Sequence, residues 1–136
     1  MAHILIVDDE VDMLTLLSKI ITEKTNHNAT STNNPLEVPN LIKEGAFDLL
    51  ITDLKMPGMD GMELILEVKK IDKTIPILVI TAYGSEQSAE EATRIGAYNY
   101  FTKPFRKEQI LIAISRALEW KDMKDRLNMI DRKSSN

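Results

Sequence analysis

Three short aliphatic runs constrain the fold of this chain most, because each one ends abruptly in polar residues. The runs occupy residues 3–7, 49–52 and 76–81. An uninterrupted aliphatic run of this length, bounded by turn residues, is typical of a strand that is buried on both faces of a sheet. Residues with helical spacing lie between the runs, so the sequence predicts an α/β fold built on a parallel sheet.

The complete pattern alternates strand and helix five times. Two weaker strands are predicted over residues 27–32 and 99–103, and helices over 11–25, 34–45, 61–70, 85–95 and from 106 to past 132. Crossovers of helix length imply a doubly wound, five-stranded parallel sheet, and the common strand order 2-1-3-4-5 is that of flavodoxin-like folds. The switch point then lies between strands one and three, which brings Asp8, Asp9 and Asp53 together at one sheet edge.

The composition is that of one ordinary globular domain. The chain has 136 residues, 43% of them hydrophobic and 28% charged, and no apolar run approaches the ~20 residues of a membrane span. It contains no cysteine, which excludes a disulfide framework, a thiolate metal site and a cysteine nucleophile. The net charge of −4 argues against direct nucleic-acid binding by this segment, and we expect a cytoplasmic location.

Three carboxylates at one sheet edge repel one another unless a cation lies between them. Because Mg²⁺ prefers oxygen ligands, Asp8, Asp9 and Asp53 predict a magnesium site. The competing interpretation is that Asp8 or Asp9 only caps the helix that follows. The acidic turn also disfavours a flavodoxin-like cofactor carrier, because a flavin phosphate would meet three negative charges there.

Thr81 and Lys103 end two further strands at the same predicted edge. Phosphoryl transfer requires a hydroxyl donor and an ammonium beside a metal site, because these groups position and neutralise the transferring group. Asp53 is then a candidate nucleophile that becomes an aspartyl phosphate. The enzymatic alternative is an aspartate-nucleophile phosphatase, but that chemistry favours a carboxylate two residues after the nucleophile, where this chain has Lys55.

These strand ends resemble the signature of the response regulator receiver domain of two-component signalling. The similarity covers residues 4 to about 118, and its motifs are Asp8-Asp9, Asp53, Thr81-Ala82 and Lys103-Pro104. The resemblance implies a phosphorylation-dependent switch in which a sensor histidine kinase supplies the phosphoryl group to Asp53. It implies no enzymatic turnover beyond self-phosphotransfer and slow autodephosphorylation.

The resemblance also assigns the metal ligands. Asp9 would bind Mg²⁺ directly and Asp8 chiefly through water. Asp53 and the backbone carbonyl of Lys55 would complete the protein's share of the site.

The same resemblance identifies the residues that respond to the phosphoryl group. Lys103 would pair with phosphoryl oxygens, and its peptide bond to Pro104 is expected to be cis. Thr81 would hydrogen-bond a phosphoryl oxygen and move toward it, and Tyr100 would rotate inward. The changed surface is expected on the fourth helix, the fifth strand and the fifth helix.

Two bulky residues flank the expected path of a hydrolytic water. Lys55 lies two residues after Asp53, and Tyr83 lies two residues after Thr81. A side chain as large as Tyr83 could shield the acyl phosphate, which predicts a longer lifetime than a small residue would allow.

Helix-forming residues continue past residue 118, where a receiver normally ends. Trp120, Met123, Leu127 and Ile130 are spaced three, four and three residues apart, the a/d pattern of a coiled coil. We therefore predict a receiver over residues 1–118 and, over 119–136, a helical extension that forms a parallel homodimer and leads toward a missing output domain. This arrangement resembles enhancer-binding transcription activators. The alternatives are a helix that folds back on its own domain, and a stand-alone receiver that acts through a partner protein.

Overall fold

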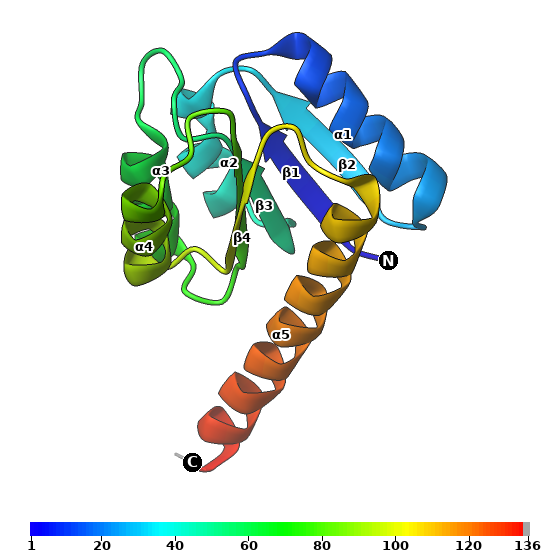
Figure 1. The fold of residues 1–136 in the computed structure, drawn as a ribbon. Helices are drawn as coiled ribbons and strands as arrows, with labels where there is room; N and C mark the ends of the chain where they lie inside the picture. The colour runs from blue at the N-terminus through cyan, green and yellow to red at the C-terminus, as the bar shows by residue number, and fades with distance from the viewer. Residues whose placement is uncertain (135–136) are drawn as a thin grey trace.

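A five-stranded parallel sheet forms the centre of the protein (Figure 1). The computed structural model describes residues 1–134, with the side chains of residues 1–130. The strands are β1 His3–Val7, β2 Asn28–Thr32, β3 Leu49–Thr52, β4 Ile77–Thr81 and β5 Asn99–Thr102. Their order is β2-β1-β3-β4-β5, and each neighbouring pair is parallel, so the predicted fold class is confirmed.

Helices cover both faces of the sheet, as the β-α alternation requires. Over the described residues they are α1 Val11–Lys24, α2 Val38–Lys43, α3 Gly61–Ile71, α4 Glu86–Ile95 and α5 Lys107–Ser134. The buried residues of α1 and α5 pack against one face, whereas those of α2, α3 and α4 pack against the other (Figure 1). Because the strands are parallel, their carboxyl ends all lie at one edge of the sheet.

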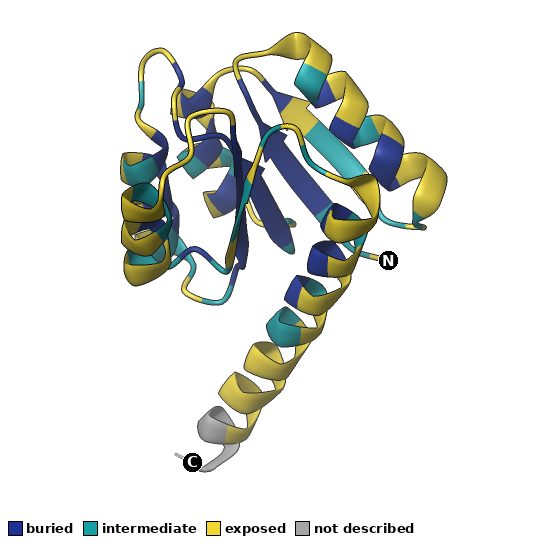
Figure 2. Ribbon diagram, in the orientation of Figure 1, coloured by how far each residue is buried: buried dark blue, intermediate teal, exposed yellow. Residues whose placement is uncertain are grey.

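The core is aliphatic because alternate residues of each strand point to opposite layers. In β1, Leu5 and Val7 contact the layer of α2, α3 and α4, whereas Ile4 and Ile6 contact α1 and α5. Figure 2 shows β1, β3 and β4 as the buried centre of the molecule. Each fully buried aliphatic side chain stabilises the fold by roughly 1.5–3 kcal/mol. These strands are therefore rigid supports for the loops that follow them.

Proline and glycine shape two of the helices. Asn34 caps a 3₁₀ turn, η1 Pro35–Glu37, and α2 begins only at Val38, with Pro39 in its first turn. Pro39 therefore delays the helix, as its fixed φ and missing donor predict. Gly96 ends α4 at φ +125° and ψ 4°. This is a positive φ, but it lies outside the αL region that a glycine ending a helix commonly adopts.

The fifth helix continues far beyond the sheet (Figure 1). Its first three turns bury Ile110 and Ile114 against the sheet, whereas residues 122–130 are exposed. Trp120 is half-buried and contacts Tyr98 of the domain. Residues 135–136 of the predicted extension lie outside the described residues. Among residues 1–134, no helix combines the length and hydropathy needed to cross a membrane.

Candidate functional site

The sheet topology brings the predicted site residues to one edge. Asp8 follows β1 and Asp53 follows β3, and the two strands are neighbours with Val7 paired to Thr52. The backbone N–H of Asp53 donates to the carbonyl of Val7 at 3.3 Å. On the other side, Lys103 follows β5 and its N–H donates to the carbonyl of Thr81 at 2.8 Å. The carboxyl ends of four strands therefore converge on one loop cluster.

The Lys103 ammonium joins the acidic residues of this edge. Its Nζ lies 2.8 Å from Asp8 Oδ2, 3.1 Å from Asp53 Oδ2 and 3.6 Å from Glu10 Oε1. The side chains of Lys103, Asp8 and Asp53 are at most 8% exposed. Two buried carboxylates therefore share one buried cation.

Backbone groups hold the two buried carboxylates in place. Asp8 Oδ1 accepts the N–H of Glu10 at 2.9 Å, and Asp53 Oδ1 accepts the N–H of Leu54 at 2.6 Å. The turn after Asp53 closes where the N–H of Gly61 donates to the carbonyl of Leu54 at 2.8 Å. A Cβ on Gly61 would lie 2.5 Å from the Asp53 carbonyl oxygen, so only glycine fits at the start of α3. The loops themselves thus fix where the carboxylates point.

Burial and pairing shift the ionisation of this cluster in opposite ways. Burial raises the pKa of Asp8 above its ordinary value, and the hydrogen bonds from Lys103 and from the Glu10 N–H only partly offset it. Burial alone would lower the pKa of Lys103, but its hydrogen bonds with Asp8 and Asp53 outweigh burial and raise it. Lys103 is therefore held as a cation at neutral pH.

The structure gathers a different acidic trio from the one that the sequence predicted. Carboxylate oxygens of Asp8, Glu10 and Asp53 all lie within 4.8 Å of one another, an all-oxygen set that fits a hard divalent cation. Asp9 is exposed and is not in this group. Glu10 was missed because it lies beyond the strand end, and its adjacency to two aspartates was the available signal.

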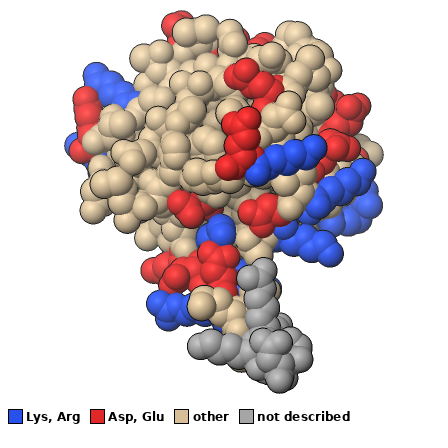
Figure 3. All heavy atoms as spheres, turned by 180° about the vertical axis from the view of Figure 1, so that it is seen from behind, with Lys and Arg blue, Asp and Glu red and all other residues tan. Residues whose placement is uncertain are grey.

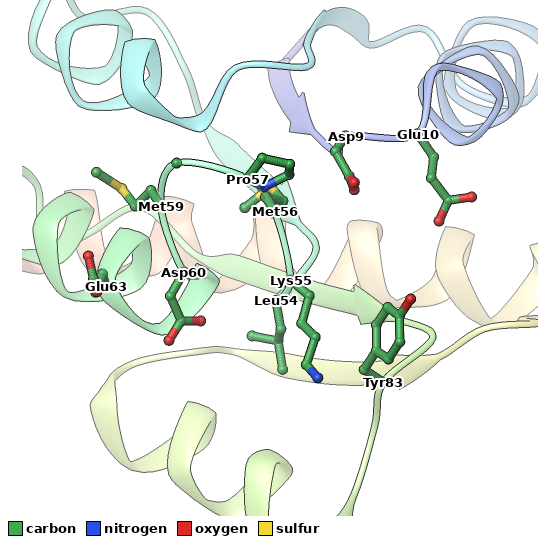
Figure 4. A pocket seen from close by; sticks show the side chains of 11 residues that line it. Asp9, Glu10, Leu54, Lys55, Met56, Pro57, Met59, Asp60, Glu63 and Tyr83 are labelled. Carbon is green, nitrogen blue, oxygen red and sulfur yellow. The ribbon is translucent and has the colours of Figure 1, made fainter.

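Asp9 lines an open hollow of about 930 Å³ beside the buried cluster. Figure 4 shows Asp9 and Glu10 on one side of this hollow and Lys55 and Tyr83 on the other. The Lys55 Nζ lies 4.7 Å from the centroid of the Tyr83 ring, so the two side chains form a cation–π pair at its rim. The predicted flanking residues therefore contact each other.

The two predicted switch residues contact the β4–α4 loop and the first turn of α4, respectively. Thr81 is fully buried, and its Oγ1 accepts the N–H of Tyr83 at 3.1 Å. The Tyr100 hydroxyl lies 2.6 Å from Ser88 Oγ. Ser88 also forms the capping box of α4 with Ser85. The predicted cis peptide bond between Lys103 and Pro104 is confirmed.

The surface charge is mixed. On the face that Figure 3 draws, acidic and basic side chains of the described residues lie interspersed. This distribution agrees with the small net charge of −4.

Comparison with known proteins identifies the family. Residues 4–115 match the response regulator receiver domain. The transcriptional regulatory protein ZraR of Klebsiella oxytoca is 35% identical over 85% of this chain and 26% of its own length. The sporulation initiation phosphotransferase F of Bacillus subtilis is 34% identical over 87% of this chain and 94% of its own length.

Solved structures agree with this match. The beryllofluoride-activated NtrC4 receiver domain dimer is 33% identical, with a TM-score of 0.84 over 89% of this chain and 99% of that chain. NtrX from Brucella abortus, solved with ADP, is 29% identical, with a TM-score of 0.86 over 99% of this chain and 30% of that chain. The chain spans 26% of the length of the transcriptional regulators ZraR, GlrR and QseF. The family match over residues 4–115 and the fold similarity agree, and the chain belongs to the response regulator receiver domain family.

Proposed function

We propose that Asp53 accepts a phosphoryl group from a phosphohistidine of a sensor kinase, and that this modification switches the domain between two states. The observation that carries the proposal is the position of the Lys103 ammonium. It lies 2.8 Å from Asp8 and 3.1 Å from Asp53, residues 95 and 50 positions away in the sequence. Burying these charges together is costly, and such clusters are typical of functional sites.

In the proposed reaction, a carboxylate oxygen of Asp53 attacks the phosphorus atom. A P–O bond forms as the P–N bond breaks, and the imidazole leaves with the electron pair of that bond, neutral when its other nitrogen is protonated. Lys103 lies beside the attacking carboxylate and neutralises the phosphoryl oxygens. Thr81, at the end of the adjacent strand, donates its hydroxyl to one of them.

The acidic residues have oxygen donors that fit Mg²⁺, which when bound would neutralise negative charge on the phosphoryl group. Asp8 and Asp53 would hold it, together with the backbone carbonyl of Lys55. The family resemblance adds Asp9 as a ligand. Glu10 is a further candidate, because its carboxylate lies close to those of Asp8 and Asp53.

The switch itself follows from the hydrogen bonds of Thr81 and Tyr100. When Thr81 turns toward a phosphoryl oxygen, its bond with the Tyr83 N–H is lost and the β4–α4 loop is released. Tyr100 can then leave Ser88 and move into the space that Thr81 vacates. Phosphorylation favours this state only by the contacts that it adds there. The surface of α4, β5 and α5 would change.

We further propose that the switch controls a transcription-activating output domain in the cytoplasm, and that two copies associate. The regulators ZraR, GlrR and QseF are named as transcriptional, and the similar NtrC4 receiver was solved as a dimer. The second candidate is a stand-alone receiver that acts by protein–protein contact. The CheY protein of Halobacterium salinarum favours it, because this chain spans 96% of that protein's length.

The residue two positions after Asp53 does not suit turnover of an external phosphate ester. A phosphatase of this type would use a carboxylate two residues after the nucleophile as its general acid. That position is Lys55, whose ammonium contacts the Tyr83 ring. Self-phosphotransfer and slow hydrolysis are the chemistry that remains.

Intact-mass analysis after treatment with acetyl phosphate tests the phosphoacceptor. We expect one phosphoryl group on the wild type in the presence of Mg²⁺ and little when EDTA removes the metal. Asp53→Asn should gain none. Asp60→Asn is the matched control, because Asp60 caps α3 and asparagine can accept the same hydrogen bond, and it should react like the wild type. Equal labelling of Asp53→Asn and the wild type would overturn the proposal.

A further inference from the structure

Trp120 contacts its own domain through residues of other elements. Its ring centroid lies 5.8 Å from that of Tyr98, which precedes β5. The Nζ of Lys69, at the end of α3, lies 5.4 Å from the same ring. The ring is therefore held between the end of one helix and the start of a strand.

Lys69 is fixed on the domain side of this contact. Its ammonium donates to the carbonyl of Ile75 at 2.6 Å, and burial lowers its pKa. Its stem runs over Gly96, where an added Cβ would lie 3.1 Å from Lys69 Cγ. We call Lys69, Tyr98 and Gly96 the Trp120 socket.

The next residues of α5 leave the domain at this point. Lys121 still reaches Thr74, with its Nζ 3.3 Å from Thr74 Oγ1. Beyond it, the side chains of residues 122–130 are exposed. Met123 is 61% exposed and Leu127 is 50% exposed, although both share the heptad face of Trp120.

The Trp120 ring therefore has two competing sets of contacts, one in its own domain and one in a pair of α5 helices. In a parallel pair of α5 helices, an a/d face is self-complementary, because each residue meets its copy on the partner helix. A partner helix that paired along this face as far as Trp120 would collide with the socket residues, because these residues contact the Trp120 ring in the monomer. One ring cannot fill both places.

We propose that Trp120 is a latch that docks either in its socket or in the seam between two copies of this chain. In the docked state, which this structure shows, the exposed seam begins at Met123. Release of Trp120 lengthens the seam by one position and strengthens pairing with a second copy. The inference rests on the proposed homodimer and does not depend on the role of Asp53.

Sedimentation equilibrium over a range of concentrations tests the latch. Lys69→Met and Tyr98→Ala weaken the socket and leave the seam intact. Because aromatic and cation–π contacts of this kind are each modest, we expect dimerisation to tighten by about three- to tenfold. Lys73→Met is the matched control, because this exposed lysine lines the surface hollow that lies beside Trp120, Lys69 and Tyr98, whereas the domain's cation–π contact with the ring comes from Lys69. It should behave like the wild type.

The Trp120→Ala background separates a latch from a general effect on the surface. With Trp120 removed, Lys69→Met should no longer change dimerisation. Dimerisation that is unchanged or weaker in the two socket variants overturns the latch, as does an effect of Lys69→Met that persists without Trp120. If neither the wild type nor any variant associates, the proposed homodimer is wrong and the latch is wrong with it. Far-UV circular dichroism verifies that each variant is folded, and the two socket variants test the same point independently.

Discussion

Replacement of Lys103 by methionine is the most informative perturbation of the buried site. The change keeps most of the apolar stem and removes the ammonium that contacts Asp8 at 2.8 Å and Asp53 at 3.1 Å. Both carboxylates then remain buried, at 3% and 1% side-chain exposure, without their shared cation. The variant therefore isolates the energetic contribution of this one positive charge.

The magnitude follows from two opposing effects. At an effective dielectric constant of about 20, each ion pair at this separation attracts by about 5–6 kcal/mol, and the desolvation of three charges offsets much of that attraction. Removing one partner of a buried pair typically costs about 3–5 kcal/mol. We expect Lys103→Met to lower the free energy of unfolding at pH 7 by about 3 kcal/mol, because proton uptake by Asp8 limits the loss.

The pH dependence of this loss has a definite sign. Removing Lys103 removes a hydrogen bond that lowers the pKa of Asp8, so the pKa of Asp8, already raised by burial, rises further in the folded variant. A raised folded pKa means that the folded state binds the proton more tightly, and stability is lost as pH rises through that pKa. The gap between variant and wild type should therefore be widest at neutral pH and narrow toward acid.

Urea unfolding of both proteins at several pH values from neutral to acid measures this gap. Mg²⁺ should stabilise the variant more than the wild type, because a cation replaces the missing ammonium. Equal stability of the two proteins at pH 7, or a gap that widens toward acid, would refute the reasoning.

Three further predictions concern the surroundings of the site. Tyr83→Ala removes the ring that contacts Lys55 and should speed dephosphorylation severalfold, which corresponds to an activation free energy lower by about 1 kcal/mol. An unchanged or slower rate of phosphate release would contradict shielding by Tyr83. Ser88→Ala removes the partner of the Tyr100 hydroxyl and part of the α4 cap, and it should destabilise the unphosphorylated state by about 1 kcal/mol in urea unfolding. Gly61→Ala should cost roughly 1–3 kcal/mol in the same assay, because its Cβ would overlap the Asp53 carbonyl, whereas a neutral effect would show that the loop can yield.

The fold was predictable because its strongest signals are local. Each central strand is an uninterrupted aliphatic run, and the helix-length crossovers restrict the topology to a parallel order. Asp53, Thr81 and Lys103 were placed at one edge by that topology alone. The contact of Lys103 with Asp8 was not predicted, because β5 and β1 are separated by two strands and only the length of the lysine side chain spans that distance.

The remaining features depend on geometry that spacing does not encode. Whether Asp9 or Glu10 joins the acidic trio depends on the backbone angles of one turn, and neighbouring carboxylates look alike in sequence. The heptad spacing placed Trp120 with Met123 and Leu127, but it does not reveal that Lys69 and Tyr98 already cover that position. The first case requires the geometry of one turn, and the second requires knowledge of which distant residues face a given side chain.

Chemical mapping of the phosphorylated residue tests the central claim most directly. Hydride reduction converts an aspartyl phosphate into homoserine and leaves phosphorylated histidine or serine unreduced. After acetyl phosphate and Mg²⁺, peptide mass spectrometry should find homoserine at position 53 and at no other aspartate. Reduction at Asp8, Asp9 or Asp60 in place of Asp53, or a phosphoryl group that resists reduction, would contradict the account.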